Sequence, residues 1–174
     1  NDLGWIQYTG GTTGDPKGAM LTHRNGCHNI MSIAVWLGWT RNEGVLLSGF
    51  PFFHIAGLTV CESAIYMGWT QVLIPNPRDT DHICNEMIKY HPTNMANVPS
   101  LYQMLIENPK FKEMDHTHLG TCISAAAPFP KESQVVLENI IGKGKLLELY
   151  GMTETSPVST MNPTSPLPCM FAST

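Results

Sequence analysis

The sequence predicts an α/β protein in which layered sheets are joined by crossover helices. Short apolar segments rich in β-branched or aromatic residues alternate with helix-like stretches along the 174 residues, which is typical of parallel strands connected by helices. The apolar segments lack strict alternation, as expected when both faces of a sheet are covered. Hydrophobic residues make up 43% of the chain, which is enough to build one folded core.

Six of the apolar segments are predicted to be strands because they are short and rich in strand-forming residues. They span residues 5–9, 45–48, 71–74, 95–97, 121–124 and 146–149. Three helices are predicted between them. The first is capped by Thr22 and runs to about residue 37, and the others cover residues 79–90 and 131–141. The residues expected to stop these helices are Gly38, Pro92 and Gly142.

The composition disfavours several classes of function. Charged residues make up 14% of the chain, against about 25% in a typical soluble domain, so polar surface is scarce unless something covers part of it. The net charge of −4 and the lack of basic clusters disfavour nucleic acid binding. The longest apolar runs fall short of the roughly 18 to 20 residues of a membrane span. No transmembrane segment is therefore expected, and only a peripheral membrane contact is compatible with the sequence.

Cysteine usage and the start of the chain also carry information. Five cysteines are spread along the chain without a Cys-x-x-Cys pair, which predicts reduced, mostly buried thiols in a cytoplasmic protein. The chain begins with neither an initiator Met nor a signal peptide, so we expect that it does not start where its gene does. His116 and His118, with Asp115, suggest a metal site, but two His separated by one residue in a polar stretch are more typical of a solvated loop, so they are assigned no role.

The segment after the first predicted strand carries the strongest chemical signal. It reads Tyr8-Thr9-Gly10-Gly11-Thr12-Thr13-Gly14-Asp15-Pro16-Lys17-Gly18. Bare backbone N–H groups, hydroxyls and one cation are what an oligophosphate requires. The spacing fits neither a Walker A loop, because Gly10 and Gly11 have no Gly five positions on, nor the Gly-x-Gly-x-x-Gly of a dinucleotide loop. An unrelated P-loop NTPase is therefore disfavoured.

This string resembles the signature loop of the adenylate-forming (AMP-binding) superfamily, which includes acyl-CoA synthetases, luciferases and adenylation domains. The usual form is Tyr-Thr-Ser-Gly-Thr-Thr-Gly-x-Pro-Lys-Gly, and ten of eleven positions match, counting the free one. The departure is Gly10 in place of Ser, a variant seen in fatty acyl-CoA synthetases. The continuation over residues 19–25 also looks like those enzymes.

Three further segments follow in the order of that superfamily. Residues 52–57, Phe-Phe-His-Ile-Ala-Gly, resemble the motif whose His lies beside the acyl-binding pocket. Residues 149–154, Leu-Tyr-Gly-Met-Thr-Glu, resemble the Tyr-Gly-x-Thr-Glu motif. A weaker match, residues 124–128, resembles a small-residue turn that flanks adenine. The resemblance covers residues 3 to about 160.

The resemblance implies a domain organisation. Residues 1–160 are expected to be a partial AMP-binding domain, the central part of a large N-terminal domain, and residues 161–174 an unassigned Pro-, Ser- and Thr-rich tail. From residue 155 onward no side chain is charged, and four prolines are expected to interrupt any regular element. This end is expected to be either an unpaired piece of a larger fold or disordered. The C-terminal lid domain of the family is expected to be absent.

The resemblance also implies roles for individual residues. Lys17, Glu154 and His54 are the catalytic candidates, and Mg²⁺ is expected to bind near the Thr9 hydroxyl and the Glu154 carboxylate. In the same scheme Thr153 binds the α-phosphate of ATP and Tyr150 stacks on adenine. The residues expected to contact the nucleotide are Thr9, Gly10, Gly11, Thr12, Thr13, Gly14, Lys17, Ala125, Ala126, Glu148, Tyr150, Gly151, Met152 and Thr153.

Each of these side chains also has a plainer interpretation when it is taken alone. Lys17 and Glu154 are then solvated surface charges, and His54 is a packed residue beside two phenylalanines. The motifs favour the functional role for these three. For Tyr150, packing of a half-buried aromatic ring and stacking on adenine are compatible.

The implied reaction is attack of a carboxylate on the α-phosphorus of ATP, followed by capture of the acyl group by the thiol of coenzyme A. An amino acid substrate is disfavoured, because His54 stands where amino-acid-activating members have Asp, and the apolar residues 55–66 favour a fatty acid. Leu58 stands where some long-chain members have a gating Trp, so chain length stays open. The alternative is a truncated, non-catalytic nucleotide-binding or interaction fragment. We expect this chain alone to be inactive and to expose apolar faces.

Overall fold

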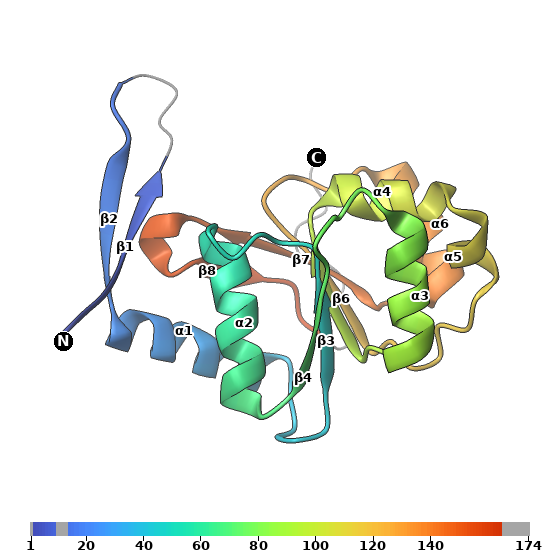
Figure 1. Cartoon of the computed structure of the whole chain (residues 1–174), viewed down its shortest axis with the longest axis horizontal. Coiled ribbons are helices and arrows are strands. Elements are labelled where there is room, and N and C mark those ends of the chain that lie inside the picture. The colour runs from blue at the N-terminus through green and yellow to red at the C-terminus, as the bar shows by residue number, and fades with distance from the viewer. Residues whose placement is uncertain (1, 10–13, 165–174) are drawn as a thin grey trace.

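The computed structural model describes residues 2–9 and 14–164 and contains a two-stranded hairpin and an α/β body (Figure 1). Its strands are β1 (Leu3–Thr9), β2 (Lys17–Thr22), β3 (Val45–Ser48), β4 (Thr70–Leu73), β5 (Asn94–Asn97), β6 (Thr121–Ser124), β7 (Leu146–Gly151) and β8 (Val158–Met161). Its helices are α1 (His23–Trp36), α2 (Ile55–Met67), α3 (Thr80–Tyr90), α4 (Pro99–Glu107), α5 (Pro109–Glu113), α6 (Lys131–Ile141) and the 3₁₀ turn η1 (Thr153–Thr155).

The body is built on one six-stranded sheet in the order β4-β3-β5-β6-β7-β8. Neighbouring strands from β4 to β7 pair in parallel, whereas the last strand, β8, pairs antiparallel with β7. Helices α1 and α2 lie toward the hairpin, whereas α3 to α6 gather at the other end of the view in Figure 1. The α/β prediction is confirmed, and five of the six predicted strands form the parallel part of this sheet.

Neighbouring residues of the central strands supply the cores on the two faces. Met95, Cys122 and Leu146 pack with α3, α4 and α6 in one hydrophobic cluster. The residues that follow them, Ala96, Ile123 and Leu147, pack with residues of α1 and α2 in the other. Because successive side chains point to opposite faces, both faces are covered, as the lack of strict alternation predicted.

The first predicted strand departs from the expected parallel pattern. Strand β1 pairs with β2 in a separate antiparallel hairpin, with Ile6 opposite Met20 and Thr9 opposite Lys17. A connection this short cannot make a parallel crossover, which needs a dozen or more residues. The sequence prediction missed β2 because its first residues, Lys-Gly-Ala, are depleted in strands.

Helix α2 was also missed, because it is apolar on nearly every side and shows no amphipathic stripe. The three predicted helices agree with α1, α3 and α6 to within one residue at each end. Thr22 caps α1 as predicted, because its hydroxyl accepts a hydrogen bond from the Asn25 N–H at 3.2 Å. The Asn25 side chain accepts one from the Thr22 N–H at 2.9 Å in return, completing a capping box.

The proline-rich end contains a regular element that the sequence did not indicate. Strand β8 lies between Pro157 and Pro163, so these prolines flank it without interrupting the ladder. Residues 165–174 and Cys169 lie outside the described residues. Of the four cysteines described, Cys84 and Cys122 are buried, Cys61 is half-buried and Cys27 is exposed. Burial raises the pKa of the Cys122 thiol to about 12.

A search of the helices within residues 2–9 and 14–164 finds none that is long and apolar enough to span a bilayer. In the same part of the chain, no group of three or more His, Cys, Asp or Glu side chains is arranged to hold a metal ion.

Candidate functional site

The hairpin brings the two ends of the phosphate-loop segment together. Strand β1 ends at Thr9 and β2 begins at Lys17, the residue directly opposite. The Thr9 hydroxyl donates a hydrogen bond to the Lys17 carbonyl oxygen at 3.3 Å. Gly14 has a φ of 117°, a conformation that only glycine adopts readily. The predicted nucleotide contacts Gly10, Gly11, Thr12 and Thr13 lie outside the described residues.

Two contacts hold the hairpin beside the other motifs. The Gln7 side-chain amide donates to the Phe53 carbonyl oxygen at 2.7 Å, which ties β1 to the residue before His54. Strand β2 lies against η1, the turn that carries Glu154. Trp5 packs on His23 with ring centroids 5.5 Å apart. Three motifs that are distant in the sequence therefore meet at one end of the molecule.

His54 is the N-cap of α2 and is exposed. Its Nδ1 accepts a hydrogen bond from the Ala56 N–H at 3.1 Å, which places the proton of the neutral ring on Nε2. A Cβ on Gly57 would lie 2.2 Å from the Pro51 carbonyl oxygen, so only glycine lets the first turn of α2 approach this loop closely. Gly57 therefore fixes how His54 is presented.

The turn after β6 is fixed by backbone and carboxylate contacts. The N–H of Ala125 donates to the Asn97 carbonyl oxygen at 3.2 Å, and Ala126 has a φ of 72°. Glu148 on β7 accepts a hydrogen bond from the Phe129 N–H at 2.8 Å. Glu148 thus holds this turn against β7, a structural contact that the motif alone did not indicate. Tyr150, on the same strand, is 61% exposed.

Glu154 sits in a tight turn whose shape is set by its own backbone. The Met152 N–H donates to the Pro157 carbonyl oxygen at 3.0 Å. A Cβ on Gly151 would lie 2.3 Å from the same oxygen, so the motif glycine is required for this close approach. Met152 and Glu154 are exposed, whereas Thr153 is half-buried. Within the part of the chain that the structure describes, neither Glu154 nor Lys17 forms an ion pair.

A polar groove of about 580 Å³ opens next to this turn. Residues of α1 form one wall and the turn forms the other. Its lining residues are Arg24, Asn25, His28, Asn29, Ser32, Glu154, Thr155 and Ser156. Hydroxyl, amide and carboxylate groups dominate, which suits a polar or charged ligand.

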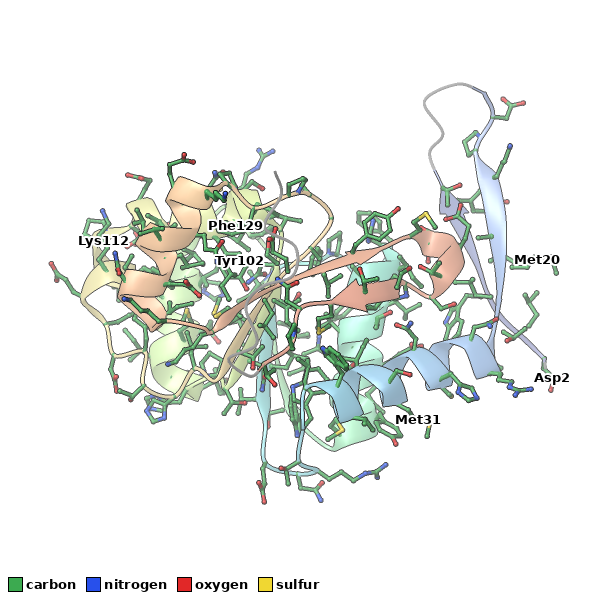
Figure 2. All side chains as sticks on the ribbon, turned by 180° about the vertical axis from the view of Figure 1, so that it is seen from behind. Asp2, Met20, Met31, Tyr102, Lys112 and Phe129 are labelled. Carbon is green, nitrogen blue, oxygen red and sulfur yellow. The ribbon has the colours of Figure 1, made fainter. Side chains whose placement is uncertain are left out.

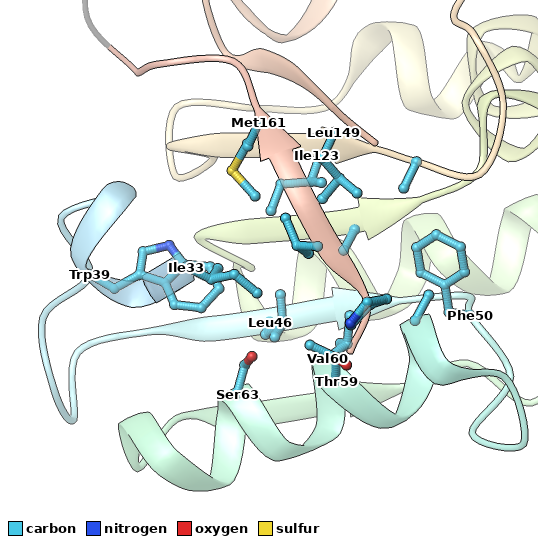
Figure 3. A pocket seen from close by; sticks show the side chains of 15 residues that line it. Ile33, Trp39, Leu46, Phe50, Thr59, Val60, Ser63, Ile123, Leu149 and Met161 are labelled. Carbon is cyan, nitrogen blue, oxygen red and sulfur yellow. The ribbon is translucent and has the colours of Figure 1, made fainter. Parts of the chain in front are cut away.

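A second, apolar cavity of about 50 Å³ lies between the sheet and helices α1 and α2 (Figure 3). Trp39 and Phe50 lie at opposite ends of it in this view. The residues Ala56 and Ala125 connect it to the His54 loop and to the turn after β6. The remaining lining residues are Ile33, Leu46, Thr59, Val60, Ser63, Ala96, Ile123, Leu149, Pro157, Val158 and Met161.

The expectation of a solvated loop for His116 is wrong. His116 is 7% exposed, and its Nε2 lies 2.6 Å from the Phe111 carbonyl oxygen. His118 is exposed and its ring packs against that of His91 in a tilted arrangement, with centroids 4.3 Å apart. No local pattern distinguishes the two histidines, because the packing of Phe111 under the loop decides which ring is buried.

Comparison with known proteins agrees with this arrangement. The sequence matches the family described as AMP-binding enzyme over residues 1–171. It is 38% identical over 167 residues to the long-chain-fatty-acid–CoA ligase of Bacillus subtilis, covering 93% of this chain and 29% of that protein. The ligase of the same name from Escherichia coli O6:H1 is 39% identical with the same coverage.

A solved structure with the same fold is ATP-bound MatB from Rhodopseudomonas palustris. It superposes with a TM-score of 0.85 at 32% identity, covering 95% of this chain and 32% of MatB. The chain spans about 29% of the length of the two curated ligases named above. Since the family match extends over nearly all of the sequence, this chain belongs to the AMP-binding enzyme family.

Proposed function

We propose that the whole protein containing this chain activates a carboxylic acid with ATP and then transfers the acyl group to coenzyme A. The first step forms an acyl-adenylate and releases pyrophosphate, and the second forms a thioester. The observation that carries the proposal is the meeting of the hairpin, the His54 loop and the Glu154 turn at one end of the molecule. Membership of the AMP-binding family and relatives named long-chain-fatty-acid–CoA ligase support it.

The groups needed to bind a nucleoside triphosphate are supplied by Thr9, Lys17 and Glu154. The Lys17 ammonium neutralises phosphate charge that builds on the departing pyrophosphate, and the loop before it offers backbone N–H groups. Thr9 and Glu154 carry hard oxygen donors of the kind that Mg²⁺ prefers. The Glu154 carboxylate fits that role because it is exposed beside the polar groove and pairs with no described cation. Mg²⁺ would neutralise phosphate charge when bound.

The adenine and acyl groups are assigned to either side of the turn after β6. Tyr150, Gly151, Met152 and Thr153, together with Ala125 and Ala126, are assigned to the adenine and the α-phosphate. The apolar cavity beneath Ala56 and Ala125 is assigned to the acyl group. Because this cavity is lined almost entirely by apolar side chains, it favours a fatty or other apolar acid over an amino acid. At about 50 Å³ it must widen to hold a long chain.

His54 is assigned to the reacting end of the acyl group. Its Nδ1 is occupied by the Ala56 N–H, so only Nε2 is free to contact a carboxylate or an acyl-adenylate. The ring orients the acid at the mouth of the cavity.

We also propose a cytoplasmic location for the protein. The free thiols of the four described cysteines support it.

The test is acid-dependent ATP–pyrophosphate exchange by the full-length enzyme, with carboxylic acids of graded chain length. We expect exchange with apolar acids and none with amino acids. Lys17→Ala should weaken ATP binding by at least about tenfold, since a hydrogen bond to a charged group contributes roughly 1.5 to 3 kcal/mol. Lys131→Ala, which removes an exposed Lys at the start of α6, is the matched control and should have no effect.

Two results would contradict the proposal separately. Absence of exchange with every acid would reject carboxylate activation. Unchanged nucleotide affinity in Lys17→Ala would reject the phosphate role of the hairpin. The acid screen would still test the reaction.

A further inference from the structure

Asn29, in the middle of α1, connects this helix to the chain that follows Glu154. Its side-chain amide nitrogen donates to the Val158 carbonyl oxygen at 2.8 Å and to the Thr155 carbonyl oxygen at 3.4 Å. Its carbonyl oxygen accepts from the Val158 N–H at 3.2 Å. Both ends of one amide are thus engaged by backbone groups of the same short segment, which fixes the orientation of the amide as well as its distance.

The internal hydrogen bonds of the turn give it a shape but do not place it. The Thr155 N–H donates to the Met152 carbonyl oxygen at 3.1 Å, and the Ser156 N–H to that of Thr153 at 3.2 Å. Both bonds join residues of the turn to each other. The Asn29 amide, by contrast, joins the turn to another element, and it does so directly after Glu154.

Helix α1 is also the continuation of the phosphate-loop hairpin. Strand β2 begins at Lys17 and ends at Thr22, and α1 begins at the next residue. The capping box of Thr22 and Asn25 stiffens this junction. Lys17 and Asn29 therefore belong to one continuous unit. Strand β2 of this unit lies against η1, and the Asn29 amide adds the side-chain hydrogen bonds that link the unit to the segment after Glu154.

We propose that Asn29 is a positioning residue that sets the Glu154 carboxylate relative to the phosphate hairpin. The inference rests on the proposed function, because it assigns Asn29 to the assembly of the MgATP site. Asn29 acts through the turn and not on the nucleotide, since its amide is already occupied by Thr155 and Val158. A second tether lies about two turns further along α1. The Trp36 indole N–H donates to the carbonyl oxygen of Asn162, the residue after β8, at 3.2 Å.

The test compares three variants of the full-length enzyme. Asn29→Ala removes all three hydrogen bonds. Asn29→Asp keeps the shape and the acceptor for the Val158 N–H, but it sets a carboxylate oxygen against the Thr155 and Val158 carbonyls. Gln103→Ala is the matched control, because it also removes a side-chain amide that joins two elements, here α4 to Ser133 of α6 at 3.3 Å, and it lies outside the groove.

The measured quantities are the Mg²⁺ dependence of adenylation and the binding of Mn²⁺ with a non-hydrolysable ATP analogue, followed by electron paramagnetic resonance. Asn29→Ala and Asn29→Asp should raise the metal concentration for half-maximal rate, and the Mn²⁺ dissociation constant, at least fivefold. The KM for the acid should stay within twofold, and Gln103→Ala should match the unsubstituted enzyme. A thermal unfolding curve for each variant separates loss of the metal effect from loss of the fold.

A merely structural role predicts something different. If both Asn29 variants melt earlier but keep the metal dependence of Gln103→Ala, Asn29 does not position Glu154 and the inference is overturned. If the unsubstituted enzyme activates no acid, the proposed function fails, and the Mn²⁺ measurement still decides whether Asn29 shapes a metal–nucleotide site.

Discussion

At the scale of single residues, the surroundings of a side chain decide its chemistry. Glu148 and Glu154 lie six residues apart in the sequence. The Glu148 carboxylate accepts a hydrogen bond from the Phe129 N–H, whereas Glu154 is exposed beside the groove. His116 is buried against Phe111, and its Nδ1 finds no partner among the described residues. Residue type identifies what a group can do, but burial and partners determine what it does.

His116 provides a pH prediction at this scale. Burial lowers the pKa of the His116 imidazole from its ordinary value near 6.5. The unfolded chain therefore binds more protons than the folded one as pH falls below 6.5, and the free energy of unfolding should decrease from there until the lowered pKa is passed. His116→Gln keeps a donor for the Phe111 carbonyl and removes this titration.

The measurement is urea unfolding of the full-length protein between pH 7.5 and 5. The unsubstituted protein should lose stability over this range more steeply than His116→Gln. His28→Gln, at an exposed histidine of α1, is the control and should follow the unsubstituted protein. Equal slopes for all three would show that the burial of His116 does not couple to folding.

At the scale of elements, local signals located the parallel strands and three of the helices but missed β2, α2, α4, α5 and β8. Strands β3 and β6 match the predicted residues 45–48 and 121–124 fully, because apolar β-branched runs at the centre of a covered sheet have a strong local signature. Strand β2 and helix α2 lack such a signature. Strand β2 contains Gly and Lys and pairs with β1 alone among the described strands. Helix α2 is stabilised by burial against the sheet.

The Thr22 cap gives a prediction at the element scale. Thr22→Ala removes the acceptor for the Asn25 N–H and should lower the free energy of unfolding by about 1 kcal/mol. Thr22→Ser retains the hydroxyl and should cost only a small part of that. Denaturant unfolding of the full-length variants measures both. The same loss in Ala and Ser variants would mean that the hydroxyl does not cap α1.

At the scale of the whole molecule, apolar side chains are exposed on the elements around the site. Val35 on α1 and Ile65 on α2 are 82% and 75% exposed, and Met20 on β2 is 71% exposed. Figure 2 shows Met20 and Met31 pointing away from the hairpin and from α1. Because exposed apolar side chains lose contact with water when two surfaces meet, we expect these positions to favour association. A surface that another surface covers would also explain the low charge content of the sequence. The chain spans about 29% of the length of its curated relatives.

We therefore expect the 174-residue chain on its own to be inactive and to self-associate. Lys17, His54 and Glu154 are all exposed, so water is not excluded from an acyl-adenylate. ATP–pyrophosphate exchange by the isolated chain should be at background, and light scattering should rise with concentration. Val35→Lys combined with Ile65→Lys should reduce the scattering without restoring exchange. Robust exchange by the isolated chain would contradict the prediction.

The sequence by itself determined the α/β class, the central strands and the motifs that relate the chain to AMP-binding enzymes. These are encoded locally, in apolar runs and in short strings such as residues 8–18. Only the tertiary structure decided that β1 pairs with β2 and that Glu148 holds the turn at Phe129. It also decided that Asn29 reaches Val158, 129 residues away. Such contacts depend on how the sheet brings distant segments together, and no local pattern specifies which backbone group will stand opposite a given side chain.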